Sequence, residues 1–370
     1  MFSIKNLFRH GPGPSSLYSI HPFRIAKEFK DECHDATTII VTLYGQLKDN
    51  SQENFTVQAL KNAISPFVTR IVLNEEEEED PEISLAKFQA FGKKKSLIKE
   101  ATYHFTKLGE LSEIEDINLE SVTIKDLLDW TYENGRSIWE FAVKTDSSNL
   151  EEYMSYKWKI MTKSITHGLE VEGSLPGSDS EAKKASLYLS RSLQNRDFIQ
   201  QVSKTMAYAL AVIEESASGK TVVTAPTAKS SGIIPGVLYS LMEVYQVSEK
   251  RVVRGLITAG MIGKLLYKEI LNGNTFTDIN IAIAMASAAA TQIMGGSPKQ
   301  VIAAAAISLN DLQHEKDRIN SHMSYIELNA MGAAKSLDNA TWALLSDKNI
   351  TKEIDFFCQL TMEKEYIEVN

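Results

Sequence analysis

The first third of the chain contains short apolar runs whose spacing predicts strands and one short helix. TTIIVTLYG (37–45) is rich in β-branched residues and ends at a glycine, and RIVLN (70–74) has the same character, so both predict strands. QALKNAI (58–64) has the apolar spacing of a short helix. ISLAKFQAF (83–91) and the run that ends at Phe105 flank the turn GKKK, which predicts a hairpin.

From residue 123 onward the apolar period is that of helices. Thr123 and Asp126 have the spacing of a capping box, and Gly135 is placed to end the helix that follows. One apolar helix face is predicted from Leu150, Met154, Trp158, Met161 and Ile165. Longer helical patterns cover 179–194, 196–217, 232–245, 248–271, 277–294 and 298–312.

These two patterns predict an α+β protein with two domains. We expect a mixed α/β domain at residues 1–115 and an all-helical domain at residues 123–365, which agrees with a chain too long for one ordinary core. The boundary is predicted in the acidic stretch GELSEIEDINLES.

Composition narrows the possible compartments and partners. A net charge of −9 argues against nucleic acid or anionic lipid as the main partner. The two cysteines, Cys33 and Cys358, exclude a disulfide scaffold and a cluster held by three thiolates of this chain. The most apolar run (279–294) is short for a membrane span, and the N-terminus lacks a signal peptide's apolar core. We therefore expect a cytoplasmic protein.

The stretch APTAKSSGIIPGVL (225–238) is the strongest local signal for a binding site. Prolines and glycines predict a tight turn, and an apolar helix follows at once. A turn in this position presents Lys229, Ser230 and Ser231 toward a pocket.

Several segments together resemble the bacterial iron–sulfur L-serine dehydratases of the single-chain, β-then-α type. GPGPSSLYSIHPFRIA (11–26) resembles the motif that opens the family's β domain, and EGSLPG (172–177) and 225–238 resemble motifs of its helical α domain. Further matching segments follow in the family's order: IGKLLYK (262–268), AIAMASAAA (282–290), GGSPKQ (295–300) and IELNAMGAAK (326–335).

The resemblance implies a 4Fe–4S cluster held by three cysteines, whose open iron acts as a Lewis acid on the substrate hydroxyl. In this chain the three cysteine positions carry Ser231, Thr275 and Tyr325. Tyr18 and Asn54 replace the two histidines that the family motifs carry. From these replacements we predict a diverged protein with no iron–sulfur cluster, no other cofactor and no bound metal.

The first functional hypothesis is a lyase that acts on, or binds, a small amino acid in a cavity between the two domains. Tyr18 and Lys229 are the candidate acid–base pair, with Ser231 as a third catalytic residue. The candidate substrate-binding residues are Ser15, Ser16, Ser19, Asn54, Thr227, Thr275, Tyr325 and Asn329.

Three alternatives remain open from the sequence. Lys229 is equally well explained as an exposed turn lysine. The whole chain is equally well explained as an inactive paralogue that binds a ligand, forms a homodimer or joins a complex of pathway proteins. A hydrolase using Ser231 or Ser230 with Lys229 as base is a weaker hypothesis, as is metal binding by HEKDRINSH (314–322).

Overall fold

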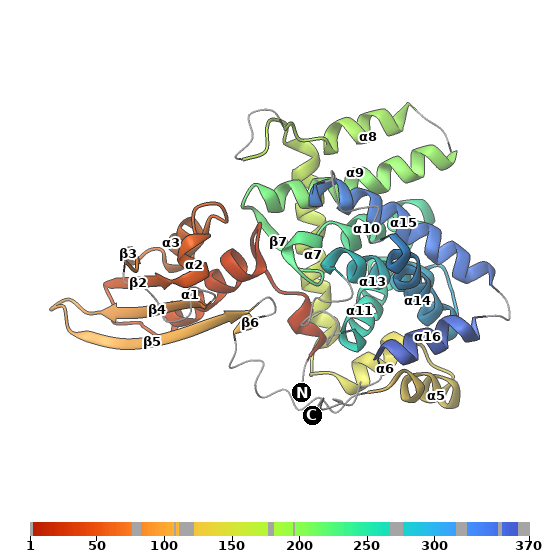
Figure 1. Ribbon diagram of the computed structural model, residues 1–370, viewed down its shortest axis with the longest axis horizontal. Helices are drawn as coiled ribbons and strands as arrows, with labels where there is room; N and C mark the ends of the chain where they lie inside the picture. The colour runs from red at the N-terminus through yellow and green to blue at the C-terminus, as the bar shows by residue number, and fades with distance from the viewer. Residues whose placement is uncertain are drawn as a thin grey trace, which may run out of the picture.

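A computed structural model of the chain describes residues 3–75, 83–106, 109–110, 122–176, 181–194, 197–266, 277–315, 324–346 and 350–361. A sheet with its helices forms one end of the molecule, and a larger helical body forms the other (Figure 1). The prediction of an α+β protein, with a mixed α/β part followed by a helical part, is confirmed. The predicted boundary, 111–121, lies outside the described residues.

The sheet has five strands in the order β3-β2-β4-β5-β6. Its strands are β2 (Thr38–Tyr44), β3 (Val68–Leu73), β4 (Ser84–Phe91), β5 (Leu97–Thr106) and β6 (Gly109–Glu110). β2 pairs in parallel with β3 and antiparallel with β4, and β4 and β5 form the predicted hairpin. The two predicted strands and the short helix are confirmed as β2, β3 and α3.

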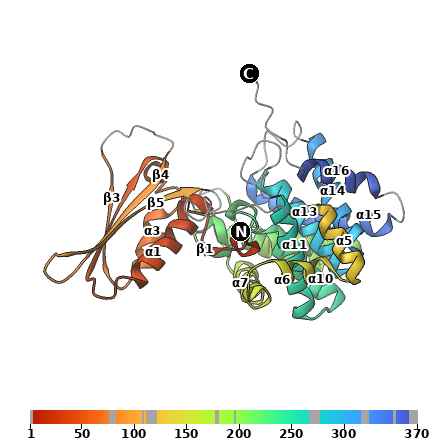
Figure 2. The same cartoon turned by 90° about the horizontal axis from the view of Figure 1, so that it is seen from below.

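One face of the sheet is covered by helices. These are α1 (His21–Asp31), α2 (Gly45–Asp49) and α3 (Thr56–Ile64). Buried and half-buried residues alternate along β2 and β4, because successive side chains of a strand point to opposite faces. Ile39, Val41 and Phe88 pack with Phe29 of α1 and Leu60 of α3 in a core of their own. Figure 2 shows α1 and α3 together beside the strands.

The N-terminal segment packs in the helical body and not on the five-stranded sheet. It contains η1 (Ile4–Leu7) and β1 (His10–Pro12). Ile4, Leu7 and Phe8 are fully buried in the core of the helices, and β1 pairs antiparallel with β7 (Thr221–Val223). The chain therefore starts inside the helical body, and after β1 it continues through η2 (Ser16–Ile20) into α1 beside the sheet.

The helical body is built around one almost wholly buried helix, α13. Its helices are α5 (Ile124–Asn134), α6 (Ile138–Thr145), α7 (Leu150–Glu170), α8 (Ala185–Leu193), α9 (Asp197–Ala217), α10 (Ile233–Tyr245), α11 (Glu249–Leu265), α13 (Asp278–Ile293), α14 (Pro298–Glu315), α15 (Tyr325–Leu345) and α16 (Thr351–Thr361). The alanines and serines of α13 let α10, α11, α14 and α15 pack closely around it.

The ends of the helices follow the predicted capping signals in most places. Thr123 and Asp126 form the predicted capping box of α5, and Gly135 ends that helix with a positive φ of 60°. The pattern at 179–194 is shorter than predicted, because α8 begins only at Ala185, where the carboxylate of Glu214 accepts from the first backbone N–H groups.

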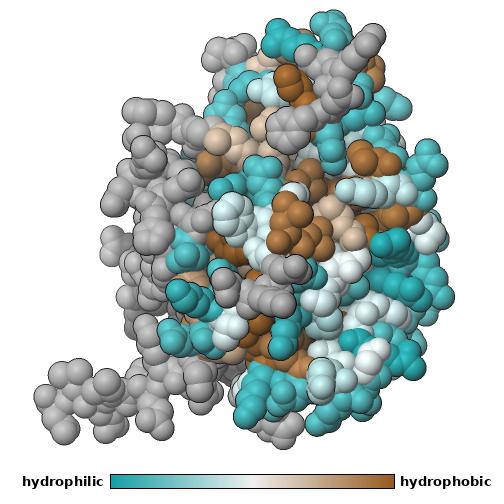
Figure 3. Space-filling model, turned by 90° about the vertical axis from the view of Figure 1, so that its right-hand side faces the viewer, coloured by the Kyte–Doolittle hydropathy of each residue, from teal (hydrophilic) through white to brown (hydrophobic). Residues whose placement is uncertain are grey.

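The surface carries scattered apolar side chains. Figure 3 shows one face of the helical body, on which brown apolar side chains are interspersed with teal hydrophilic ones. Trp342 and Leu345, near the end of α15, are 67% and 80% exposed. Among the described residues, no helix has both the length and the apolar character that crossing a bilayer requires.

Candidate functional site

The first motif folds into a turn held by its own serines. Ser15 is the N-cap of η2, and its Oγ accepts from the backbone N–H of Tyr18 at 3.1 Å. Ser19 Oγ donates to Ser15 O at 2.7 Å and accepts from Ser15 N at 3.1 Å. The hydroxyls of Ser15 and Ser19, both predicted to bind substrate, are therefore used inside the turn.

Ser16 joins the first motif to the second, which lies more than 200 residues away in sequence. Ser16 Oγ accepts from the backbone N–H of Ala228 at 2.9 Å, and both groups are buried. Gly13 lets the first motif lie close against α9, because a Cβ at that position would lie 2.2 Å from the backbone oxygen of Ser216. The motifs that were predicted to meet thus share a direct contact between the sheet-side turn η2 and η3 (Ala228–Ser230).

The second motif forms a tight turn between β7 and α10. Ser230 Oγ donates to Ala225 O at 3.0 Å and accepts from Thr227 N at 3.4 Å. Thr227 Oγ1 donates to Asp278 Oδ2 at 3.0 Å, which ties the turn to the first residue of α13. Sequence reasoning missed Asp278, although an acid in the first turn of a helix is an ordinary capping signal.

Asn329 fixes the same turn from α15. Its Oδ1 accepts from Gly232 N at 3.0 Å, and its Nδ2 donates to Lys229 O at 2.8 Å and to Tyr325 O at 2.7 Å. Asn329 is fully buried, so these bonds satisfy its amide without water. Asn329, predicted to bind substrate, therefore lies beside the turn, but its side-chain amide hydrogen-bonds backbone groups of the protein.

Ser231 is the polar residue of the turn whose side chain is left unpaired. Its Oγ is buried and has no hydrogen-bond partner among the described residues. Tyr325 begins α15 and is half buried, and burial, with the nearby Glu181 adding to it, raises the pKa of its phenol. A free buried hydroxyl and a protonated phenol therefore belong to this junction.

Lys229 does not have the burial on which its proposed role as a base depended. Its side chain is exposed, as in the alternative of a turn lysine. Tyr18 is half buried, its phenol lies 3.5 Å from Gln46 Oε1, and burial raises its pKa. Among the described residues no hydrogen bond joins Lys229 to Tyr18 or Ser231, so the acid–base pair and the Ser–Lys hydrolase gain no geometric support.

Asn54 and Thr275 complete the set of predicted residues. Asn54 Nδ2 donates to Asn50 O at 3.0 Å within its own loop. The loop touches the first motif two residues later, where Thr56 Oγ1 donates to Tyr18 O at 2.6 Å. Thr275 lies outside the described residues. The side chains of HEKDRINSH (314–322) also lie outside the part that the structure describes.

A buried carboxylate pair on α9 was not found from the sequence. Glu215 Oε2 lies 2.5 Å from His167 Nδ1, and its Oε1 accepts from Lys183 Nζ at 3.3 Å. Burial raises the pKa of Glu214, although the N–H groups of α8 hydrogen-bond it. Two adjacent acids in the otherwise apolar run AVIEESA (211–217) were the available signal.

Ser16 gives a direct test of the contact between the two motifs. We expect Ser16→Ala to lower the free energy of unfolding by about 1–2 kcal/mol, because the buried N–H of Ala228 loses its acceptor. Urea unfolding of the full chain measures the change. Ser190→Ala, at an exposed position of α8, is the control, and an equal loss in both variants would contradict the contact.

The chain was compared with known proteins. Residues 54–313 match the family model described as serine dehydratase alpha chain. The chain is 26% identical to L-serine dehydratase 2 of Escherichia coli, over 93% of this chain and 90% of the relative. It is 26% identical to L-serine dehydratase of Streptomyces coelicolor (95% and 92% covered) and 27% identical to that of Haemophilus influenzae (96% and 93% covered).

These matches overturn the prediction that the protein has no cofactor. They extend over nearly the whole chain to proteins named L-serine dehydratases, for which the resemblance above implies an iron–sulfur cluster, and three replaced residues do not establish its loss. The residues present nevertheless do not fit the cluster of the resemblance. Ser231 and Tyr325 offer oxygen where thiolates are preferred, Cys33 lies in the core of the sheet and Cys358 lies on α16.

Proposed function

Because this chain belongs to the serine dehydratase family, we propose that it binds a small amino acid of the serine class where η2, η3 and the start of α15 meet, and that it acts on that ligand as a lyase. The relatives are named for L-serine, and the motifs of the resemblance lie around this junction.

The observation that carries the proposal is the unpaired Oγ of Ser231. Leaving a buried hydroxyl without a partner costs about 1–3 kcal/mol, and a ligand at this junction would supply the missing partner of Ser231 Oγ. Ser231 stands just before α10, whose N-terminal backbone dipoles favour a carboxylate. The exposed ammonium of Lys229 on the same turn adds positive charge.

The chemistry of the proposed lyase reaction assigns separate tasks to these groups. Elimination of water from a β-hydroxy amino acid breaks a Cα–H bond and the Cβ–O bond, so it needs a proton acceptor and support for the departing oxygen. A phenol is protonated at neutral pH and can donate to an oxygen, and burial raises the pKa of both Tyr18 and Tyr325 further from neutrality. The proton acceptor is left unassigned, because the charged ammonium of the exposed Lys229 has three donors and no acceptor.

Ser231→Ala tests the binding proposal. We expect at least a tenfold weaker affinity for L-serine, measured by titration calorimetry, because one hydrogen bond to the ligand is lost. The free energy of unfolding should stay the same or rise, since Ser231 Oγ makes no bond in the protein.

Ser308→Ala is the matched control for that experiment. Ser308 is also a buried serine, but its Oγ is bonded to Ser287, Ala304 and Asn339. We expect this variant to lose stability and to keep its affinity for L-serine. Equal affinity of the wild type and Ser231→Ala would contradict the proposed site.

A second function is favoured by two observations: Ser231 and Tyr325 have hydroxyl oxygens where the resemblance has thiolates, and the side chain of Lys229 is exposed. It is a non-catalytic paralogue that binds the amino acid without converting it, alone or in a complex. Release of ammonia and a 2-oxo acid from L-serine, by protein purified anaerobically with iron and sulfide, supports the lyase. Saturable binding without release supports the paralogue.

A further inference from the structure

A small hollow lies at the end of the helical body where α13 finishes. Its volume is about 360 Å³, and it is lined by Ser137, Trp139, Arg251, Arg254, Gln292 and Gly295. These residues come from the start of α6, from α11 and from the end of α13. The volume falls at the small end of the range for ligand sites, about 300–1,000 Å³.

The lining of this hollow is positively charged. It contains two guanidinium groups, one amide, one hydroxyl and an indole, and none of the six lining residues is acidic. The nearest acid of α6, Glu140, does not line the hollow: it accepts from Ser137 N at 2.9 Å and from Arg136 at 2.8 Å, and it also interacts with the charge of Arg254. The two arginines therefore face the hollow without a carboxylate lining it.

Arg254 is held in place but keeps an unused donor. Its guanidinium carbon lies 4.4 Å from the centroid of the Trp139 ring, a cation–π stack that fixes the plane of the group. Its Nε is buried and has no hydrogen-bond partner among the described residues. Arg251 donates to the backbone oxygen of Ile293, which brings the second guanidinium to the same rim.

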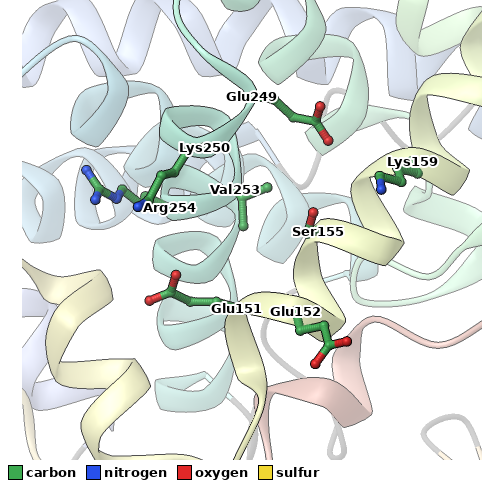
Figure 4. A pocket seen from close by; sticks show the side chains of 8 residues that line it. All are labelled: Glu151, Glu152, Ser155, Lys159, Glu249, Lys250, Val253 and Arg254. Atoms are coloured by element: carbon green, nitrogen blue, oxygen red, sulfur yellow. The ribbon is translucent and has the colours of Figure 1, made fainter.

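A neighbouring groove provides a contrast. It lies between α7 and α11, has a volume of about 480 Å³ and shares Arg254 with the hollow. Figure 4 shows Glu151, Glu152 and Glu249 around it, with the guanidinium of Arg254 directed away from Ser155 and Lys159. That groove is lined by both carboxylates and cations, whereas the residues that line the smaller hollow include two arginines and no acid.

The hollow is separate from the amino-acid site proposed above. α13 begins at Asp278, which bonds Thr227 of that site, and ends at Ile293, beside Arg251. Its 16 residues span about 24 Å at a rise of 1.5 Å per residue. A ligand in the hollow would therefore lie at the opposite end of the central helix.

We propose that this hollow is a binding site for a small oxyanion, the carboxylate or phosphate group of a metabolite, held by Arg251 and Arg254. A guanidinium offers two parallel N–H donors that match the paired oxygens of such a group. The ligand would supply the acceptor for Arg254 Nε.

The test uses the full chain and titration calorimetry with inorganic phosphate in one arm and succinate in the other, at constant ionic strength. We expect saturable binding in at least one arm, and the arm that binds identifies phosphate or carboxylate as the source. Arg254→Gln and Arg251→Gln should each weaken it at least tenfold. Arg70→Gln, which removes an exposed arginine of β3, should leave it unchanged.

The variants keep the proposal falsifiable. Arg251 is exposed, so Arg251→Gln should fold even if the half-buried position of Arg254 tolerates no change. Binding in neither arm, or binding that Arg251→Gln and Arg70→Gln weaken to the same degree, would overturn the site. The affinity of each variant for L-serine is measured in parallel. If Arg251→Gln loses oxyanion binding but still binds L-serine, the two sites are separate; if oxyanion binding is absent while L-serine binds, only the hollow is refuted.

Discussion

Replacing Gly168 with alanine is expected to lower the free energy of unfolding by about 3 kcal/mol, and this is one of the two largest effects that we predict. Gly168 lies where α7 packs against α9. A Cβ at this position would lie 2.3 Å from the backbone oxygen of Ala211 and 2.8 Å from its carbonyl carbon. Both atoms belong to backbone, so the helices must separate to admit the methyl group, and this cost exceeds the gain of about 1 kcal/mol in helix propensity.

The measurement is urea unfolding of the full chain followed by circular dichroism. Thr166→Ala is the control, because Thr166 is exposed on the same helix and its replacement improves helix propensity without meeting another helix. If Gly168→Ala unfolds at the same urea concentration as the wild type, α7 and α9 do not pack as closely as described.

The second large effect is a pH dependence of stability that arises from Lys157. Lys157 is buried on α7, with Nζ 2.7 Å from His10 Nδ1 and 4.4 Å from the centroid of the Tyr153 ring. Burial, aided by the charges of Arg24 and Arg9, lowers the pKa of Lys157 to about 7. Burial and Lys157 lower the pKa of His10 to about 4, so His10 is neutral at pH 7.

The direction of the effect follows from the lowered pKa. Between about pH 7 and the unfolded value of 10.5, the unfolded chain binds the proton that the folded protein has released, so stability rises with pH. The Lys157 contribution to this rise is on the order of 3 kcal/mol between about pH 7 and pH 9.5. His10 acts in a separate window, between about pH 4 and its unfolded value of 6.5.

Lys157→Met isolates this contribution. Methionine fills the buried space but carries no proton, so the variant should lack the rise above pH 7 that the wild type shows in urea unfolding at a series of pH values. Lys159→Met, at an exposed position on the same helix, should keep the wild-type slope. Parallel curves for the wild type and Lys157→Met would show that Lys157 is not titrated by folding.

Much of the secondary structure could be predicted because its pattern is local. Alternation along 37–45 and the capping residues Thr123 and Asp126 report the backbone state of their own segment, and the structure agrees with them. The docking of Ile4, Leu7 and Phe8 into the helical body could not be predicted, since an apolar segment does not specify which of two cores it enters.

The candidate site was predicted only in part for the same reason. The family resemblance grouped Ser16, Thr227 and Asn329 as candidate substrate-binding residues, and Ser16 and Asn329 contact the 225–231 turn. The direction of each side chain depends on partners remote in sequence, such as Asp278 for Thr227. Lys229 is followed by two buried serines, Ser230 and Ser231, so its own exposure could not be recognised from the sequence pattern.

The pairing of β1 with β7 has a consequence for biosynthesis. β1 ends at Pro12, but its partner begins at Thr221, so the first strand leaves the ribosome roughly 200 residues before it can pair. At about 5–20 residues per second this delay is on the order of 10–40 s. Expressing the sheet-bearing half alone would leave β1 and the apolar residues of η1 without the helices that cover them. A split of this gene product into two polypeptides should therefore keep residues 3–12 with the helical half.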